Sequence, residues 1–162
     1  MSLAPAVLAQ VYRFAGGPVD ISCAPSVDGW SALTWKVERR IVVLDSLCSA
    51  ADRFAQNPVL PVKRGDPLSD PAFAALVIIH ETQHIAHPEY SEAVANCAAL
   101  DLVATFSTAL GSSRKTAPRM FLRARYWTTR QPAEYQSRCT AGTTATGKIR
   151  DPGLVLRPSL RG

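Results

Sequence analysis

The segment SDPAFAALVIIHETQHIAHPEY, residues 69–90, decides the fold of this chain. Its opening Ser-Asp-Pro is typical of a helix start, because serine or aspartate caps a helix and an early proline lacks only an N–H that has no helical partner. Residues 72–79 are apolar on every side, which indicates a helix buried in the protein interior. Pro88 disfavours helical geometry in the residue before it, so we expect the helix to end at about His87.

The rest of the chain predicts a helix, three short strands and further helices, an order that indicates an α+β fold. Glu38-Arg39 separates the last two strands and favours a tight hairpin. We therefore expect a short antiparallel sheet of about three strands packed on the buried helix, with further helices C-terminal to it. The predicted elements are a helix over 3–15, strands over 19–23, 32–37 and 40–44, and helices over 45–56, 88–110 and 117–130.

The 162 residues fit one domain with a real core, which we place at 1–139, followed by a basic Thr/Gly/Pro-rich tail at 140–162. Residues 1–110 hold 7 Lys/Arg against 11 Asp/Glu, whereas residues 111–162 hold 11 against 2. The basic final third could contact nucleic acid, a membrane surface or an acidic partner, but a solvated basic face with a loose tail is the simpler interpretation. We expect no membrane span, because no apolar run approaches roughly 20 residues, and no signal peptide, so the compartment stays open.

The four cysteines match no CxxC metal pattern. They fit either four buried thiols or two disulfides in an oxidising compartment. For the second case we predict the pairs Cys23–Cys48 and Cys97–Cys139 among the three possible connectivities.

Residues 80–84 read His-Glu-x-x-His within the predicted buried helix. Side chains four residues apart lie on one helical face, so His80 and His84 can bind one ion. Glu81 points to a neighbouring sector, from which its carboxylate can reach a metal-bound water and act as general base and proton shuttle. Histidines without a metal, hydrogen-bonded at a helix end, are the alternative. A buried cluster of this kind would be costly unless it were paired or metal-bound.

This motif resembles the active-site helix of the zincin metallopeptidases. The resemblance implies a hydrolase that cleaves peptide bonds in a peptide or protein substrate, with one Zn2+ held by three protein ligands. The arrangement is similar to compact gluzincin-like proteins, in which HExxH is followed shortly by a Glu-Ala-x-Ala-x-Cys helix, and the similarity covers about residues 69–105. It implies Glu92 as the third ligand, with Glu89 and Asp101 left as alternatives.

Other HExxH and ExxH families fit less well. The metzincin pattern HExxHxxGxxH needs glycine and histidine where this chain has His87 and Tyr90. The thermolysin-like pattern needs a later glutamate, and residues 93–133 contain none. Di-iron bundles need a second ExxH pair, and deformylase-like enzymes, for which Cys97 could be a ligand, carry glycine motifs that this chain lacks.

The zincin resemblance also implies a group that stabilises the oxyanion and a strand that binds substrate. Tyr126 and Tyr135 are the candidates for the first role, and Arg123 or Arg125 could act electrostatically instead. Zincin substrates add a strand to a sheet edge, for which residues 41–44 are a candidate, although a buried central strand would show the same pattern.

A non-catalytic binding module is the main alternative to an enzyme. In that interpretation zinc is structural or absent, and the basic C-terminal region contacts nucleic acid or a protein partner. The intact Glu81 argues against it, because a structural zinc site has no use for that carboxylate.

Overall fold

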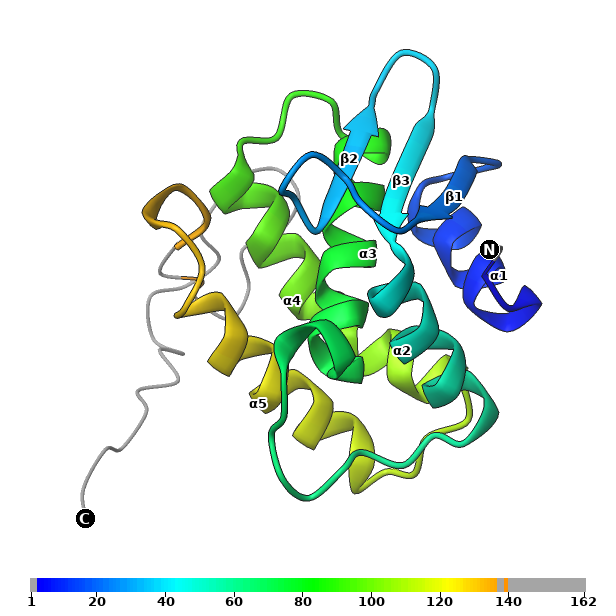
Figure 1. Cartoon of the computed structure of the whole chain (residues 1–162), viewed down its shortest axis with the longest axis vertical. Coiled ribbons are helices and arrows are strands. Elements are labelled where there is room, and N and C mark those ends of the chain that lie inside the picture. The colour runs from blue at the N-terminus through cyan, green and yellow to red at the C-terminus, as the bar shows by residue number, and fades with distance from the viewer. Residues whose placement is uncertain (1–2, 137–138, 140–162) are drawn as a thin grey trace.

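The structure is a computed structural model that describes residues 3–136 and Cys139, and these residues form an α+β fold. The helix α3 runs through the middle, with α2, α4 and α5 around it and the strands towards its C-terminal end (Figure 1). The predicted tail at 140–162 lies outside the described residues. The elements are α1 (Pro5–Phe14), β1 (Asp20–Ala24), β2 (Ala32–Trp35), β3 (Arg40–Leu44), α2 (Asp45–Gln56), the 3-10 helix η1 (Pro67–Ser69), α3 (Pro71–Ala86), α4 (Glu92–Ala109), α5 (Thr116–Thr128) and the 3-10 helix η2 (Ala133–Tyr135).

The three strands form a mixed sheet in the order β1-β3-β2. The β2–β3 hairpin is antiparallel as predicted, but β1 pairs with β3 in parallel, so the prediction of an antiparallel sheet is wrong for that pair. The chain leaves β1, returns through β2 and turns again into β3, which gives β1 and β3 the same direction. β3 takes the middle because its Ile41 and Val43 are completely buried. Of the two alternatives for residues 41–44, the structure therefore supports the buried central strand and contradicts the substrate-binding edge, whereas β2 is an edge strand.

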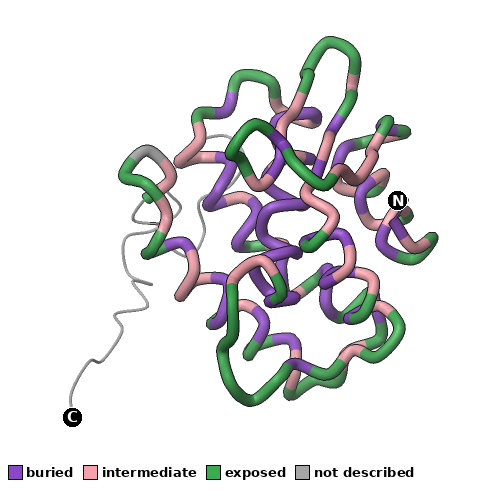
Figure 2. Tube along the Cα trace, viewed as in Figure 1, coloured by how far each residue is buried: buried purple, intermediate pink, exposed green. Residues whose placement is uncertain are grey.

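Helix α3 is buried on nearly all sides, as its apolar sequence predicts (Figure 2). Asp70 caps it, because the carboxylate accepts hydrogen bonds from the backbone N–H groups of Ala72 at 2.9 Å and Phe73 at 3.4 Å. The same carboxylate lies 3.4 Å from the guanidinium of Arg123 in α5. Although α3 is apolar, no helix in the described part of the chain combines the length and apolar character needed to cross a bilayer.

Helix α4 begins at Glu92 and packs against α3. Its cap is Ser91, whose hydroxyl accepts a hydrogen bond from the backbone N–H of Val94. Since α3 ends at Ala86, before Pro88, only residues 87–91 connect the two helices. This short turn brings the first turn of α4 back to the last turns of α3.

Two disulfides tie the helices to neighbouring segments, and both predicted pairs are confirmed. Cys23 of β1 joins Cys48 of α2, and Cys97 of α4 joins Cys139 beyond η2. They close loops of 25 and 42 residues. In a chain-entropy model, loops of this size each stabilise the fold by roughly 3–4 kcal/mol.

Candidate metal centre

His80 and His84 lie one helical turn apart on α3 and their imidazoles converge. The two Nε2 atoms are 3.2 Å apart, and the rings meet edge to face at 82°. Both side chains are buried. The rings are therefore held close together at the helix end nearest α4.

Glu92 completes the group from the first turn of α4. Its Oε2 lies 2.9 Å from His80 Nε2 and 3.3 Å from His84 Nε2. Two ligand atoms that each lie about 2.0–2.1 Å from one tetrahedral zinc ion are roughly 3.3–3.4 Å apart. The three observed separations are close to that value, so His80, His84 and Glu92 could hold a single metal ion.

The electrostatics of this group favour the protonation states that metal binding requires. The hydrogen bond with His80 is the main reason that the pKa of Glu92 falls from 4.5 to about 2. Burial lowers the pKa of His84 below its ordinary 6.5, and the nearby His80 lowers it further. At neutral pH Glu92 is therefore ionised and His84 is neutral, as ligands must be.

The Nδ1 nitrogens of both imidazoles lack the hydrogen bonds that such nitrogens make in many metal sites, as far as the described residues show. The Nδ1 atoms of His80 and His84 are buried, and neither has a hydrogen-bond partner among the described residues. Metal-binding histidines usually donate this N–H to a carboxylate or carbonyl, which orients the ring. Here the packing around α3 orients the rings instead.

Glu81 is half-buried and follows His80 on α3, and both residues line the cavity described below. Its Oε2 accepts a hydrogen bond of 2.5 Å from the Thr34 hydroxyl of strand β2. Thr34 is a site residue that the sequence analysis missed. Its partner is 47 residues away, so no local pattern could have indicated the contact.

A cavity of about 330 Å³ adjoins the metal-binding group. One wall is a single face of α3 that ends in His80 and Glu81, and the opposite walls come from the loop before β2 and from the segment after α5. The lining residues include Trp30, Phe73, Leu76, Val77, Asn96 and Tyr135. The cavity therefore offers space for a ligand directly beside both motif residues.

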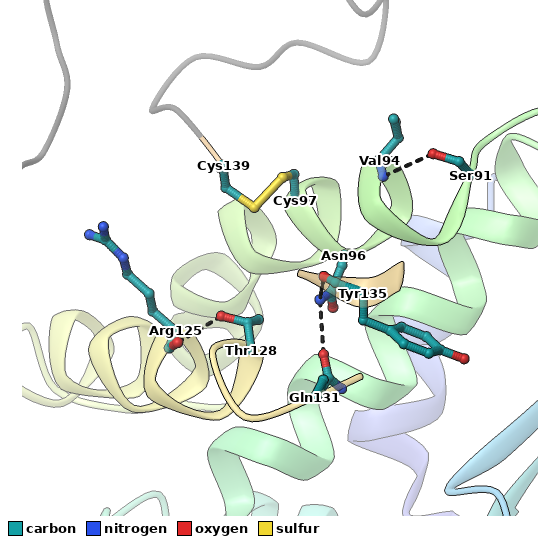
Figure 3. The surroundings of a disulfide bond; sticks show 9 residues. All are labelled: Ser91, Val94, Asn96, Cys97, Arg125, Thr128, Gln131, Tyr135 and Cys139. Atoms are coloured by element: carbon teal, nitrogen blue, oxygen red, sulfur yellow. Dashed lines mark hydrogen bonds between the residues drawn. A yellow bond between two sulfur atoms is a disulfide. The ribbon is translucent and has the colours of Figure 1, made fainter. Parts of the chain in front are cut away.

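Tyr135 of η2 is the predicted tyrosine that lines this cavity, and its ring centroid is 5.7 Å from that of His80. Asn96 of α4 holds the segment in place by donating hydrogen bonds to the Tyr135 carbonyl at 2.8 Å and to Gln131 Oε1 at 2.9 Å (Figure 3). The neighbouring Cys97–Cys139 disulfide fastens the same segment to α4 (Figure 3). Asn96 is the second site residue that the sequence analysis missed.

The other candidates for the oxyanion role lie elsewhere. Tyr126 does not line the cavity, and its ring is covered by the guanidinium groups of Arg64 at 3.9 Å and Arg130 at 3.6 Å. Arg123 is buried and bound to Asp70, so it serves the packing of α5 on α3. Arg125 is not among the lining residues either.

The alternative metal ligands do not join the group. Glu89 is exposed and lies 3.6 Å from His87, whose ring stacks on Tyr90 instead of facing the other histidines. Asp101 is an exposed residue of α4, nine positions beyond Glu92. The sulfur of Cys97 is part of a disulfide and is not available as a thiolate.

Comparison of the chain with family models, with curated proteins and with solved structures gives no match.

Proposed function

We propose that this protein is a zinc-dependent hydrolase that cleaves peptide bonds. The observation that carries the proposal is the convergence of His80, His84 and Glu92 within 3.3 Å of one another, next to a cavity lined by Glu81. Two histidines and a carboxylate are a ligand set of catalytic zinc, which keeps one position open beside three protein ligands. A purely structural zinc site would instead be closed by four ligands.

The residues around this group have the roles that hydrolysis needs. A zinc ion held there supplies Lewis acidity that makes water a nucleophile at neutral pH. Glu81 accepts the proton of the attacking water and delivers it to the leaving amine. We assign the stabilisation of the oxyanion to Tyr135, and the proximity of its ring to that of His80 supports this assignment.

Strand β2 is the element proposed to align the substrate. It is an edge strand, and its Thr34 bonds Glu81. A peptide that extends the sheet along this edge would pass the motif helix, with main-chain hydrogen bonds supplying affinity.

The two disulfides fit an oxidising compartment, where such bonds persist.

The proposal is tested by replacing Glu81 with glutamine. Zinc content is measured by mass spectrometry of the metal, and hydrolysis is measured on a broad peptide library by mass spectrometry of the products. We expect the Glu81→Gln protein to retain zinc and lose at least about a hundredfold in hydrolysis, as is typical for removal of a general base. The exposed Glu89→Gln variant is the matched control, and we expect it to keep both properties.

Other outcomes would contradict the proposal in different ways. A wild-type protein that binds zinc stoichiometrically but cleaves nothing in the library would favour the non-catalytic binding module. A wild-type protein that binds no divalent metal would rule out the hydrolase and leave only a binding module without zinc.

A further inference from the structure

Tyr126 of α5 lies between two guanidinium groups that connect the cavity with a second groove. The guanidinium carbon of Arg130 is 3.6 Å from the centroid of the Tyr126 ring, and that of Arg64 is 3.9 Å from it. The two groups stack on opposite faces of the ring, because groups so close to one centroid would overlap on the same face. Arg130 also lines the cavity beside the motif residues, whereas Arg64 lines the second groove.

The second groove lies between α5 and the loop that follows α2, and its volume is about 280 Å³. Arg123 holds this loop on α5 by donating hydrogen bonds to the carbonyl groups of Pro61 at 2.7 Å and Val62 at 3.2 Å (Figure 1). Val62 is 87% exposed and Leu122 is 60% exposed, so the groove presents aliphatic side chains to its surroundings. We call it the basic groove, and its lining residues are Leu60, Val62, Arg64, Arg119, Leu122 and Arg123.

The arginines of this surface have few anionic neighbours. Residues 102–133, which include all of α5, contain no aspartate or glutamate. Asp70 pairs with the buried Arg123. The exposed Arg64, Arg119 and Arg130 form no ion pair within the described part of the chain. Stacking on a ring occupies the flat face of a guanidinium and leaves N–H groups at its edge that match a carboxylate.

We propose that the basic groove and the stacked arginines bind an acidic segment of the polypeptide substrate on one side of the cleaved bond. This inference rests on the proposed function, since it assigns a substrate class to the same site. Carboxylates of the segment pair with Arg64, Arg119 and Arg130, which gives complementary charge. Apolar side chains of the segment contact Val62 and Leu122. These aliphatic residues favour a polypeptide over a nucleic acid, whose phosphate backbone offers them no apolar surface.

The first test measures binding without hydrolysis. Glu81→Gln protein is titrated into a fluorescent peptide in which glutamates alternate with leucines, and into a matched peptide with glutamine in place of each glutamate. Fluorescence polarisation is recorded at physiological ionic strength. We expect the glutamate peptide to bind roughly tenfold more tightly, the combined effect of several exposed ion pairs. Equal binding of the two peptides would overturn the inference even if the protein hydrolyses other peptides.

The second test changes the arginines. Arg64→Gln and Arg119→Gln should each weaken binding of the glutamate peptide by roughly two- to fivefold and leave the glutamine peptide unaffected. Arg13→Gln is the matched control, because Arg13 is an exposed arginine of α1 that lies beside an aromatic ring. Unchanged binding of the glutamate peptide in both folded variants, or an equal loss in the control, would overturn the inference.

The third test concerns the ring that holds two of the arginines. Tyr126→Leu removes the aromatic face, so the preference for the glutamate peptide should fall. Tyr126→Phe keeps the face and should retain the preference, which separates stacking from a role of the phenol hydroxyl. Loss of the preference in Tyr126→Phe as well would contradict the assigned role of the ring.

The last test asks whether the basic groove serves the cleaved substrate. A peptide that wild-type protein hydrolyses is extended on either side, at several spacings, by a run of glutamates or of glutamines. We expect the glutamate extension on one side to lower KM by roughly tenfold with kcat nearly unchanged, because the added contacts bind ground state and transition state alike. The Arg64→Gln/Arg119→Gln double variant should lose this advantage.

The outcomes separate this inference from the proposed function. Tight binding of the glutamate peptide without any effect of a glutamate extension on KM would overturn the assignment of the basic groove to the substrate. An oligonucleotide of equal charge that binds as tightly as the glutamate peptide would overturn the choice of a polypeptide. Absence of hydrolysis on every peptide would refute the proposed function, whereas the binding titration judges the basic groove by itself.

Discussion

Replacing Thr34 with valine should slow hydrolysis without removing the metal. Valine has nearly the same shape and suits a strand, so the change deletes only the hydroxyl that donates to Glu81 at 2.5 Å. A hydrogen bond to a charged group contributes roughly 1.5–3 kcal/mol, and the half-exposed position of Glu81 reduces that to about 1–2 kcal/mol. Since about 1.4 kcal/mol corresponds to a factor of ten, we expect kcat to fall roughly five- to thirtyfold.

The assay for Thr34→Val is steady-state hydrolysis of one peptide, together with zinc content. KM and zinc content should stay near wild type. In the described structure the Thr34 hydroxyl bonds Glu81 and not His80, His84 or Glu92, and Thr34 is not among the residues that line the cavity. Thr34→Ser keeps a hydroxyl and is the matched control, with an expected loss of less than about threefold. Wild-type kcat in folded Thr34→Val protein would refute the idea that this contact positions Glu81.

Three further predictions concern the metal-binding group and the second disulfide. Glu92→Gln should weaken zinc binding at least about a hundredfold in chelator competition, whereas Glu89→Gln should not, because only the former removes a charged ligand. In the metal-free protein, the pKa values of His84 and Glu92 are lower in the folded state than in the unfolded state. As the pH falls, the unfolded state therefore takes up protons before the folded state does. Denaturant unfolding should therefore show stability falling as pH drops below 6.5 through His84, and falling again between pH 4.5 and about 2 through Glu92. Replacing both Cys97 and Cys139 with serine should lower the free energy of unfolding by about 2–4 kcal/mol, and should reduce kcat/KM more than loss of the other disulfide does.

The parts of the structure that local sequence determines were predicted correctly. Asp70, Pro71 and Pro88 mark the ends of α3, and each acts within a few residues of its own position. The turn after α3 is short, so the resemblance could indicate that Glu92 returns to the histidines. The structure brings these three side chains together as expected.

The parts that long-range contacts determine were not predictable in this way. The parallel pairing of β1 with β3 depends on which strand is buried in the middle, and period-two patterns do not encode strand order. Thr34 and Asn96 are ordinary polar residues in a strand and a helix, and their roles come from partners 47 and 39 residues away. Tyr126 and Tyr135 could not be ranked from sequence, because only the packed position of η2 places one of them in the cavity wall.

In this small fold the residues that could hold a metal ion are local in sequence, and the two disulfides involve other segments than the cavity lining. Residues 80–92 contain the three side chains that could hold a metal ion, so their arrangement depends on two packed helices and one short turn. The opposite cavity walls are formed by residues 29–32 and 130–135, which are far from each other in sequence. Most of these residues lie outside the helices and strands. In sequence, Cys23 of β1 precedes the first wall and Cys139 follows the second, and each of these cysteines forms a disulfide. A domain with a limited core gains order in such segments from covalent links. Reduction should accordingly loosen substrate binding before it loosens the metal-binding group.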